Sequence, residues 1–189
     1  MNKLVAAARQ VQAVLDAAGL RFCFIGGFAA QRHAEPRVTR DVDVSILTGV
    51  GNEARVIDVM IDAFAPRRDD TRAFAERYRV LLLKTADDIG IDATLTALPF
   101  EEEIIERSST FEFAPGVWLR TCSAEDFLVM KIFAGRPIDW RDVEMVLRRY
   151  GRDKLDLDAV RQRVAPLLAA KDDAEAMPEF ERLLRKVSG

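Results

Sequence analysis

Apolar residues recur along this chain with two different periods, and the changes between them mark the expected helices and strands. A spacing of three to four residues is typical of amphipathic helices and predicts them over residues 4–18, 28–35, 53–64, 124–133, 139–150, 157–170 and 178–187, with a further helix starting at residue 99. Strict alternation or a short apolar run predicts strands over residues 20–25, 41–47, 79–85 and 89–95, and two short strands within residues 111–121.

The turn residues divide these elements into two parts. Gly26 and Gly27 end one strand and open a helix, and Asp87 and Asp88 suit a hairpin turn between two later strands. The character of the sequence changes after residue 121, where only helices follow. We therefore predict an α/β (α+β) fold with a mixed sheet and flanking helices over residues 1–121, and a C-terminal helical segment over 122–189 that closes a cleft.

Composition excludes several classes of protein. The 189 residues are 49% hydrophobic, with 28 basic and 31 acidic side chains and a net charge of −3, which excludes a disordered chain. The sequence contains no run of about 18 uninterrupted apolar residues, the length that a membrane-spanning helix needs. Arg9 interrupts the apolar stretch that a signal peptide would need near the N-terminus. We expect a cytoplasmic protein with no membrane partner.

Cys23 and Cys122 are expected as reduced core thiols, and His33 cannot complete a zinc site with them.

Three aspartates carry the candidate chemistry. Asp41 and Asp43 are two residues apart on one strand, so both point to the same face, about 6–7 Å apart. Two like charges at that distance repel by about 2 kcal/mol at an effective dielectric constant of about 20, so the pair favours a bound cation, for which Mg²⁺ is suited. Asp92 on a later strand is the candidate for a third carboxylate, with Asp87 or Asp88 as alternatives.

The glycine pair adds a candidate phosphate site. A strand-to-helix turn with Gly26 and Gly27 lets backbone N–H groups approach a phosphate, and the following helix start favours negative charge. Alone, a glycine pair is typical of a tight turn, and a D-x-D strand is typical of a solvated face. What indicates a phosphate and metal site is the combination of these features in one order along the chain. The glycine turn comes first, followed by a helix, the paired carboxylates and a later carboxylate. Arg67–Arg68 and Arg148–Arg149 are expected as solvated faces, or as contacts to an RNA backbone if they converge on the cleft.

The segment IGGFAAQRHAEPRVTRDVDVSI (25–46) resembles the signature of the DNA polymerase beta-like nucleotidyltransferase superfamily. Within it, SAEDFLVMKIFAGRPIDWRDVEMVL (123–147) is similar to the helical motif of the AbiEii-type nucleotidyltransferases, a group of prokaryotic toxin-like enzymes. The resemblance implies that Gly26 and Gly27 contact a nucleoside triphosphate and that Asp41 and Asp43 bind two Mg²⁺ ions, with Mn²⁺ as an alternative. It also implies that Asp92 completes the metal site and helps to activate an attacking hydroxyl.

The same resemblance assigns roles on the helical side. It implies that Lys131 reaches the β- or γ-phosphate and that Arg136, Asp139 and Asp142 line the same cleft.

Two residues just before the D-x-D strand, Thr39 and Arg40, are expected to touch phosphate by the same resemblance. The better-known superfamily form has serine after the first glycine, whereas this chain has Gly27.

The resemblance implies an enzyme that moves a nucleoside monophosphate from an NTP to a hydroxyl of a macromolecule, either a tRNA 3′ end or a protein side chain. Such an enzyme is expected to be the toxin of a toxin–antitoxin pair. One alternative is a small-molecule nucleotidyltransferase of the aminoglycoside-modifying type, for which Glu101–Glu103 would supply an acidic lining. Another is a weakly catalytic nucleotide-binding module.

Overall fold

The computed structural model describes residues 2–35 and 39–187. These residues group into two compact units, one formed by residues 2–28 and 39–122 and the other by residues 29–35 and 123–187. The division falls inside the helix α2 (Gly26–His33), whose first residues belong to one unit and whose last residues belong to the other. The sequence predicted a single division, between residues 121 and 122, whereas the second unit also includes residues 29–35. That the second part closes a cleft stays a prediction.

The first unit contains a seven-stranded sheet with the order β3-β4-β5-β2-β1-β7-β6. Its strands are β1 (Phe22–Phe24), β2 (Asp41–Leu47), β3 (Ala65–Pro66), β4 (Val80–Lys84), β5 (Gly90–Thr96), β6 (Ser109–Ala114) and β7 (Val117–Thr121). The pairs β2–β5 and β1–β7 are parallel and the other pairs are antiparallel, so the sheet is mixed. The predicted fold class is confirmed.

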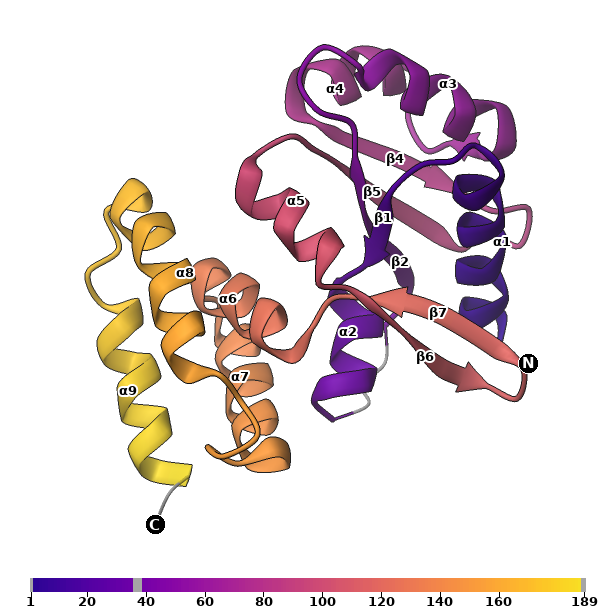
Figure 1. Cartoon of the computed structure of the whole chain (residues 1–189). Coiled ribbons are helices and arrows are strands. Elements are labelled where there is room, and N and C mark those ends of the chain that lie inside the picture. Colours follow the sequence, from indigo (N-terminus) through magenta and orange to yellow (C-terminus); the bar gives the residue numbers. More distant parts are fainter. Residues whose placement is uncertain (1, 36–38, 188–189) are drawn as a thin grey trace. The chain divides into compact units, whose positions relative to one another are not determined.

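Four further helices belong to this unit: α1 (Lys3–Ala17), α3 (Glu53–Ala63), α4 (Thr71–Tyr78) and α5 (Pro99–Glu106). Figure 1 shows α1 and α5 on opposite sides of the strands, with α3 and α4 near β4. Helix α4 is not among the helices predicted from the sequence. This helix has only eight residues, buries only Thr71 and Ala75, and ends at Arg79 in the left-handed conformation rather than at a glycine, so it lacks the usual signals.

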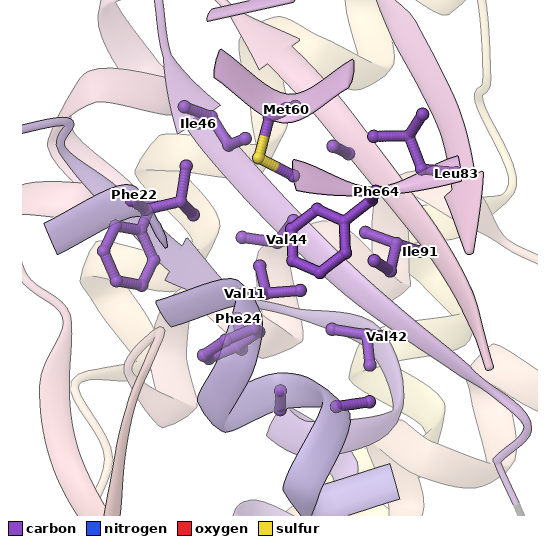
Figure 2. Close-up of a cluster of buried hydrophobic side chains, with 14 of the residues drawn as sticks. Val11, Phe22, Phe24, Val42, Val44, Ile46, Met60, Phe64, Leu83 and Ile91 are labelled. Carbon is purple, nitrogen blue, oxygen red and sulfur yellow. The ribbon is translucent and has the colours of Figure 1, made fainter. Parts of the chain in front are cut away.

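A hydrophobic core fills the space between one face of the sheet and the helices α1 and α3. Alternate residues of the strands point into it because side chains of a strand alternate between its two faces. Figure 2 shows Val11 of α1 and Met60 of α3 beside Val44 of β2 and Ile91 of β5, all of them completely buried. The opposite face of β2 and β5 therefore carries the other half of the alternation, which includes the three aspartates.

The second unit is a group of helices: α6 (Ala124–Ala134), α7 (Pro137–Tyr150), α8 (Leu157–Lys171) and α9 (Ala176–Val187), together with the last residues of α2. In Figure 1, α6 lies beside both α7 and α8. Helix α7 begins at Pro137 rather than at the predicted residue 139, since proline fits the first position of a helix. Nowhere in the described part of the chain is a helix long and apolar enough to cross a membrane.

A buried ion cluster joins α6 to α7 inside the second unit. Lys131 of α6 lies 2.7 Å from Asp139 and 2.8 Å from Asp142 of α7, and its side chain is only 8% exposed. Arg136 completes the cluster, because its Nε donates a hydrogen bond of 2.6 Å to Asp139 Oδ2. Burial raises the pKa of Asp139, but the hydrogen bonds from Arg136 and Lys131 outweigh that effect, so its pKa lies below the ordinary 3.8.

A side chain replaces part of a missing strand in the first unit. Strand β1 has three residues and pairs with β7 only at Phe24 and Thr121, which leaves part of β7 without a strand on that side. Gln12 of α1 fills this role: its Nε2 donates to the Trp118 oxygen at 2.9 Å, and the Arg120 N–H donates to its Oε1 at 3.1 Å. One amide thus makes the donor and acceptor contacts that a neighbouring strand would make.

Replacing Gln12 by alanine removes both of these bonds. We expect Q12A to lower the free energy of unfolding by about 1 kcal/mol, and to speed hydrogen exchange of the Arg120 amide. Q10A is the matched control, since Gln10 is an exposed glutamine of the same helix. Equal exchange rates of the Arg120 amide in Q12A and in the wild type would contradict this account.

Replacing Asp139 by asparagine leaves the buried Lys131 with less counter-charge. We expect D139N to lower the free energy of unfolding by about 3 kcal/mol at neutral pH, because one partner of a buried pair is lost. Because the pKa of Asp139 is depressed on folding, its stabilisation is present above the unfolded pKa and disappears as the pH falls through the lower folded pKa. The difference between wild type and D139N should therefore shrink below about pH 4.

Denaturant unfolding at a series of pH values measures this difference. D153N makes the same substitution at an exposed aspartate of the second unit. A D139N effect as small as that of D153N at neutral pH would disprove the role assigned to the buried cluster.

Candidate functional site

The register between β2 and β5 brings the three predicted aspartates onto two neighbouring strands. Asp43 pairs directly with Asp92, and Asp41 pairs with Gly90. Residues paired in this way lie on the same face, with their Cα atoms about 4.8 Å apart. The neighbours Val42, Val44, Ile91 and Ala93 are completely buried on the core face. Packing of these four residues therefore holds the carboxylates on the other face.

The register also separates Asp92 from the alternatives that the sequence left open. Asp87 and Asp88 lie in the turn between β4 and β5, both are exposed, and Asp88 is 2.7 Å from the Lys84 ammonium. Neither residue lies beside Asp43. Of the three candidates, only Asp92 shares a register position with the D-x-D strand.

The glycine turn lies directly against the same carboxylates. The Gly27 N–H donates a hydrogen bond of 3.2 Å to Asp43 Oδ2. A Cβ on Gly26 would lie 2.2 Å from Asp43 Oδ2, and Gly26 has a φ of +50°. A Cβ on Gly27 would lie 2.5 Å from Thr39 Oγ1. Both positions therefore need glycine for close approach, and the first needs it also for its backbone conformation.

The two residues before β2 take different positions. Thr39 is half-buried, packs against Gly27 and donates a hydrogen bond of 3.3 Å to the Asp41 carbonyl. Arg40 is exposed. Thr39 thus supports the entry of the chain into β2, and contact of Thr39 or Arg40 with phosphate stays a prediction.

Sequence reasoning missed one residue of this site. The Arg67 guanidinium forms an ion pair with Asp92, and its Nη1 lies 3.9 Å from Asp41 Oδ1. From the sequence, Arg67 is expected only as part of a solvated or RNA-contacting pair with Arg68. No local pattern connects residue 67 to residues 41 and 92, because the strand order of the sheet makes this contact.

The carboxylates are the right donors for a hard divalent cation. Asp41, Asp43 and Asp92 share one face of two neighbouring strands, and the side chains of Asp41 and Asp92 are 47% and 40% exposed. Within residues 2–35 and 39–187, no three or more His, Cys, Asp or Glu side chains are already gathered as a metal site. In this structure Asp43 accepts from the Gly27 N–H, and Asp41 and Asp92 pair with Arg67. The donor set fits Mg²⁺ in chemistry, and the Asp43 carboxylate occupies the position that a Cβ on Gly26 would need.

The other predicted residues form a second group within the helical unit. Lys131, Arg136, Asp139 and Asp142 lie together in the buried ion cluster of α6 and α7. The Lys131 ammonium already contacts two carboxylates there, whereas the Arg136 side chain is 69% exposed. Arg136 is thus the cation of this group that solvent reaches, and contact of Lys131 with phosphate stays a prediction.

Two solved structures have a fold similar to that of this chain. A solution structure of the antibiotic-resistance factor ANT(2'')-Ia is 16% identical, with a TM-score of 0.57 over 89% of this chain and 94% of that chain. The crystal structure of an antigenic nucleotidyltransferase-like protein from Paracoccidioides brasiliensis is 15% identical, with a TM-score of 0.55 over 94% and 92% of the two chains. At these identities the likeness concerns the fold. Among curated protein sequences, no significant match is found.

A family model covers almost the whole sequence. The model for the nucleotidyl transferase AbiEii toxin of the type IV toxin–antitoxin system matches residues 10–187. This match includes the glycine turn, all three strand aspartates and the buried ion cluster. The chain therefore belongs to the AbiEii nucleotidyltransferase toxin family and is a nucleotidyltransferase.

Proposed function

We propose that this nucleotidyltransferase moves a nucleoside monophosphate from an NTP to a hydroxyl of a macromolecule, a tRNA 3′ end or a protein side chain, in a Mg²⁺-dependent reaction. We further propose that it acts as the toxin of a pair with a cognate antitoxin. The observation that carries the chemistry is the contact between the glycine turn and the D-x-D strand, where the Gly27 N–H meets Asp43 beside Asp92.

Each part of the site has a task in this reaction. Asp41, Asp43 and Asp92 would hold the metal ions, which when bound orient the triphosphate, activate the attacking hydroxyl and neutralise charge on the leaving pyrophosphate. The turn at Gly26 and Gly27, which begins α2, is the part proposed to bind the triphosphate through its backbone N–H groups. Asp92 is the carboxylate proposed to take the proton of the attacking hydroxyl.

The macromolecular acceptor is supported by the family, whose description is that of a toxin. The small-molecule alternative is supported by the similar fold of an antibiotic-resistance factor. Its proposed acidic lining has other partners in this structure. Glu101 accepts from the Ala97 and Leu98 N–H groups, Glu102 pairs with Arg21, and Glu103 pairs with Arg107. We therefore favour the macromolecular acceptor.

Replacing both residues of the D-x-D strand tests the proposed reaction. We expect D41N/D43N to abolish transfer of label from α-³²P-NTP to an acceptor in total RNA or protein of a cell lysate, because two metal-holding charges are lost while the side-chain shapes are kept. Each NTP is tested separately, and an aminoglycoside is tested as a third kind of acceptor.

The matched control is D87N, which changes an exposed aspartate of the β4–β5 turn and should retain full labelling. Labelling that survives in D41N/D43N would refute the assigned site. Labelling of the aminoglycoside alone would replace the macromolecular acceptor with the small-molecule one.

Replacing Gly26 by alanine tests the close approach of the turn to Asp43. The new Cβ would collide with the Asp43 carboxylate, so we expect G26A to fold but to lose about 100-fold in labelling rate, the size of effect that a displaced active-site group produces. G116A is the matched control, since Gly116 also has a positive φ, of +74°, with nothing within 4 Å of a Cβ.

Both variants are destabilised because alanine is unfavourable in the left-handed conformation, but only G26A disturbs the Asp43 carboxylate. The melting temperatures of the two variants show whether this destabilisation is similar in both. Equal labelling rates in G26A and G116A would contradict the importance of the turn.

A further inference from the structure

Backbone pairing places Arg67 at the carboxylate site. Arg67 follows β3 directly, and its N–H donates a hydrogen bond of 3.1 Å to the Leu82 carbonyl of β4. Leu82 pairs with Asp92 of β5, and Asp92 pairs with Asp43 of β2. One row of residues thus crosses the sheet from Arg67 to the two aspartates, so the position of Arg67 is fixed by the same pairing that positions them.

The Arg67 guanidinium bridges two of the three carboxylates. It forms an ion pair with Asp92 Oδ1, and its Nη1 lies 3.9 Å from Asp41 Oδ1. The Arg67 side chain is 29% exposed, less than those of Asp41 at 47% and Asp92 at 40%. The Arg67 side chain as a whole is therefore more buried than the side chains of the two aspartates it joins.

Gly90 provides the space for this bridge. A Cβ at position 90 would lie 2.1 Å from Asp41 Oδ1 and 3.0 Å from Arg67 Nη1. Gly90 pairs with Asp41 across the two parallel strands. The side chains of Asp41 and Arg67 thus come together over a backbone position that carries no side chain of its own.

The next residue behaves differently and shows that the placement is specific. Arg68 pairs with Asp70 through bonds of 2.6 and 2.9 Å, and its guanidinium lies 3.9 Å from the centre of the Phe74 ring. These contacts attach Arg68 to the start of α4. Of the arginine pair, only Arg67 turns to the aspartates.

A divalent cation at this site competes with Arg67 for the same oxygens. Three carboxylates on one face repel one another, and an arginine held among them lowers that repulsion when no metal is bound. We propose that Arg67 is a built-in counter-cation that holds Asp41 and Asp92 in the metal-free protein and is displaced from them when a divalent metal binds. This proposal rests on the proposed function, since it concerns the metal site assigned there. Arg67 is in this sense a positioning residue.

The test is direct Mn²⁺ binding to metal-free protein, measured by electron paramagnetic resonance of the unbound ion. We expect R67A to bind Mn²⁺ about three- to tenfold more tightly than the wild type, the change that corresponds to losing competition from exposed ion pairs. R67K keeps the charge without the planar fork and should lie between the two. Thermal unfolding adds a second measurement: Mn²⁺ should raise the melting temperature of R67A more than that of the wild type.

R72A is the matched control, because Arg72 also pairs with an exposed aspartate, Asp58, and its loss changes the net charge equally. R72A should bind Mn²⁺ as the wild type does. Equal or weaker binding in R67A than in R72A would overturn the proposal while leaving the metal site intact. Absence of Mn²⁺ binding in both the wild type and R67A would overturn the metal site and this proposal together, whereas binding in R67A alone would support it strongly.

Discussion

The parallel pairing of β2 with β5 is the constraint on which the site depends. Side chains alternate along a strand, so a slip of one residue would turn Asp43 into the core and a valine out of it. Val44 and Ile91 on the buried face make such a slip costly, since each would lose a packed environment. The apolar core thus fixes the register, and the register places Asp43 opposite Asp92. Stability and chemistry are in this way set by the two faces of the same pair of strands.

Close backbone approach is the second requirement, and glycine meets it at three positions. At Gly26, Gly27 and Gly90 a Cβ would overlap Asp43, Thr39 or Asp41 respectively. The site is therefore built by omitting side chains as well as by placing them. Gly26 and Gly27 also begin α2, and the Gly27 N–H already points at a carboxylate oxygen. An N–H group that stabilises an anion of the protein is equally suited to an anionic ligand.

Local patterns were enough to predict most of this architecture. Alternation gave β2 at its observed bounds, and the glycine pair and the order of the aspartates indicated the site before any contact was known. What the sequence could not provide are contacts that depend on strand order. Arg67 reaches Asp92 only because β4 lies between β3 and β5, and Gln12 reaches β7 only because β1 is short. The eight-residue helix α4 was missed for a different reason, since it has few buried residues and no glycine cap.

The chain uses arginine and lysine with carboxylates in two physically different ways. Lys131 and Asp139 are buried, at 8% and 0% exposure, and removing one partner there leaves a charge that water cannot reach. Arg67 and its aspartates are partly exposed, where ion pairs are worth little and solvent replaces a lost partner. A cation that must give way to a metal needs the second environment, because a strongly held partner would block the exchange. A pair that stabilises the packing of two helices is most effective in the first. The difference in burial between the two clusters therefore matches the difference in what each is proposed to do.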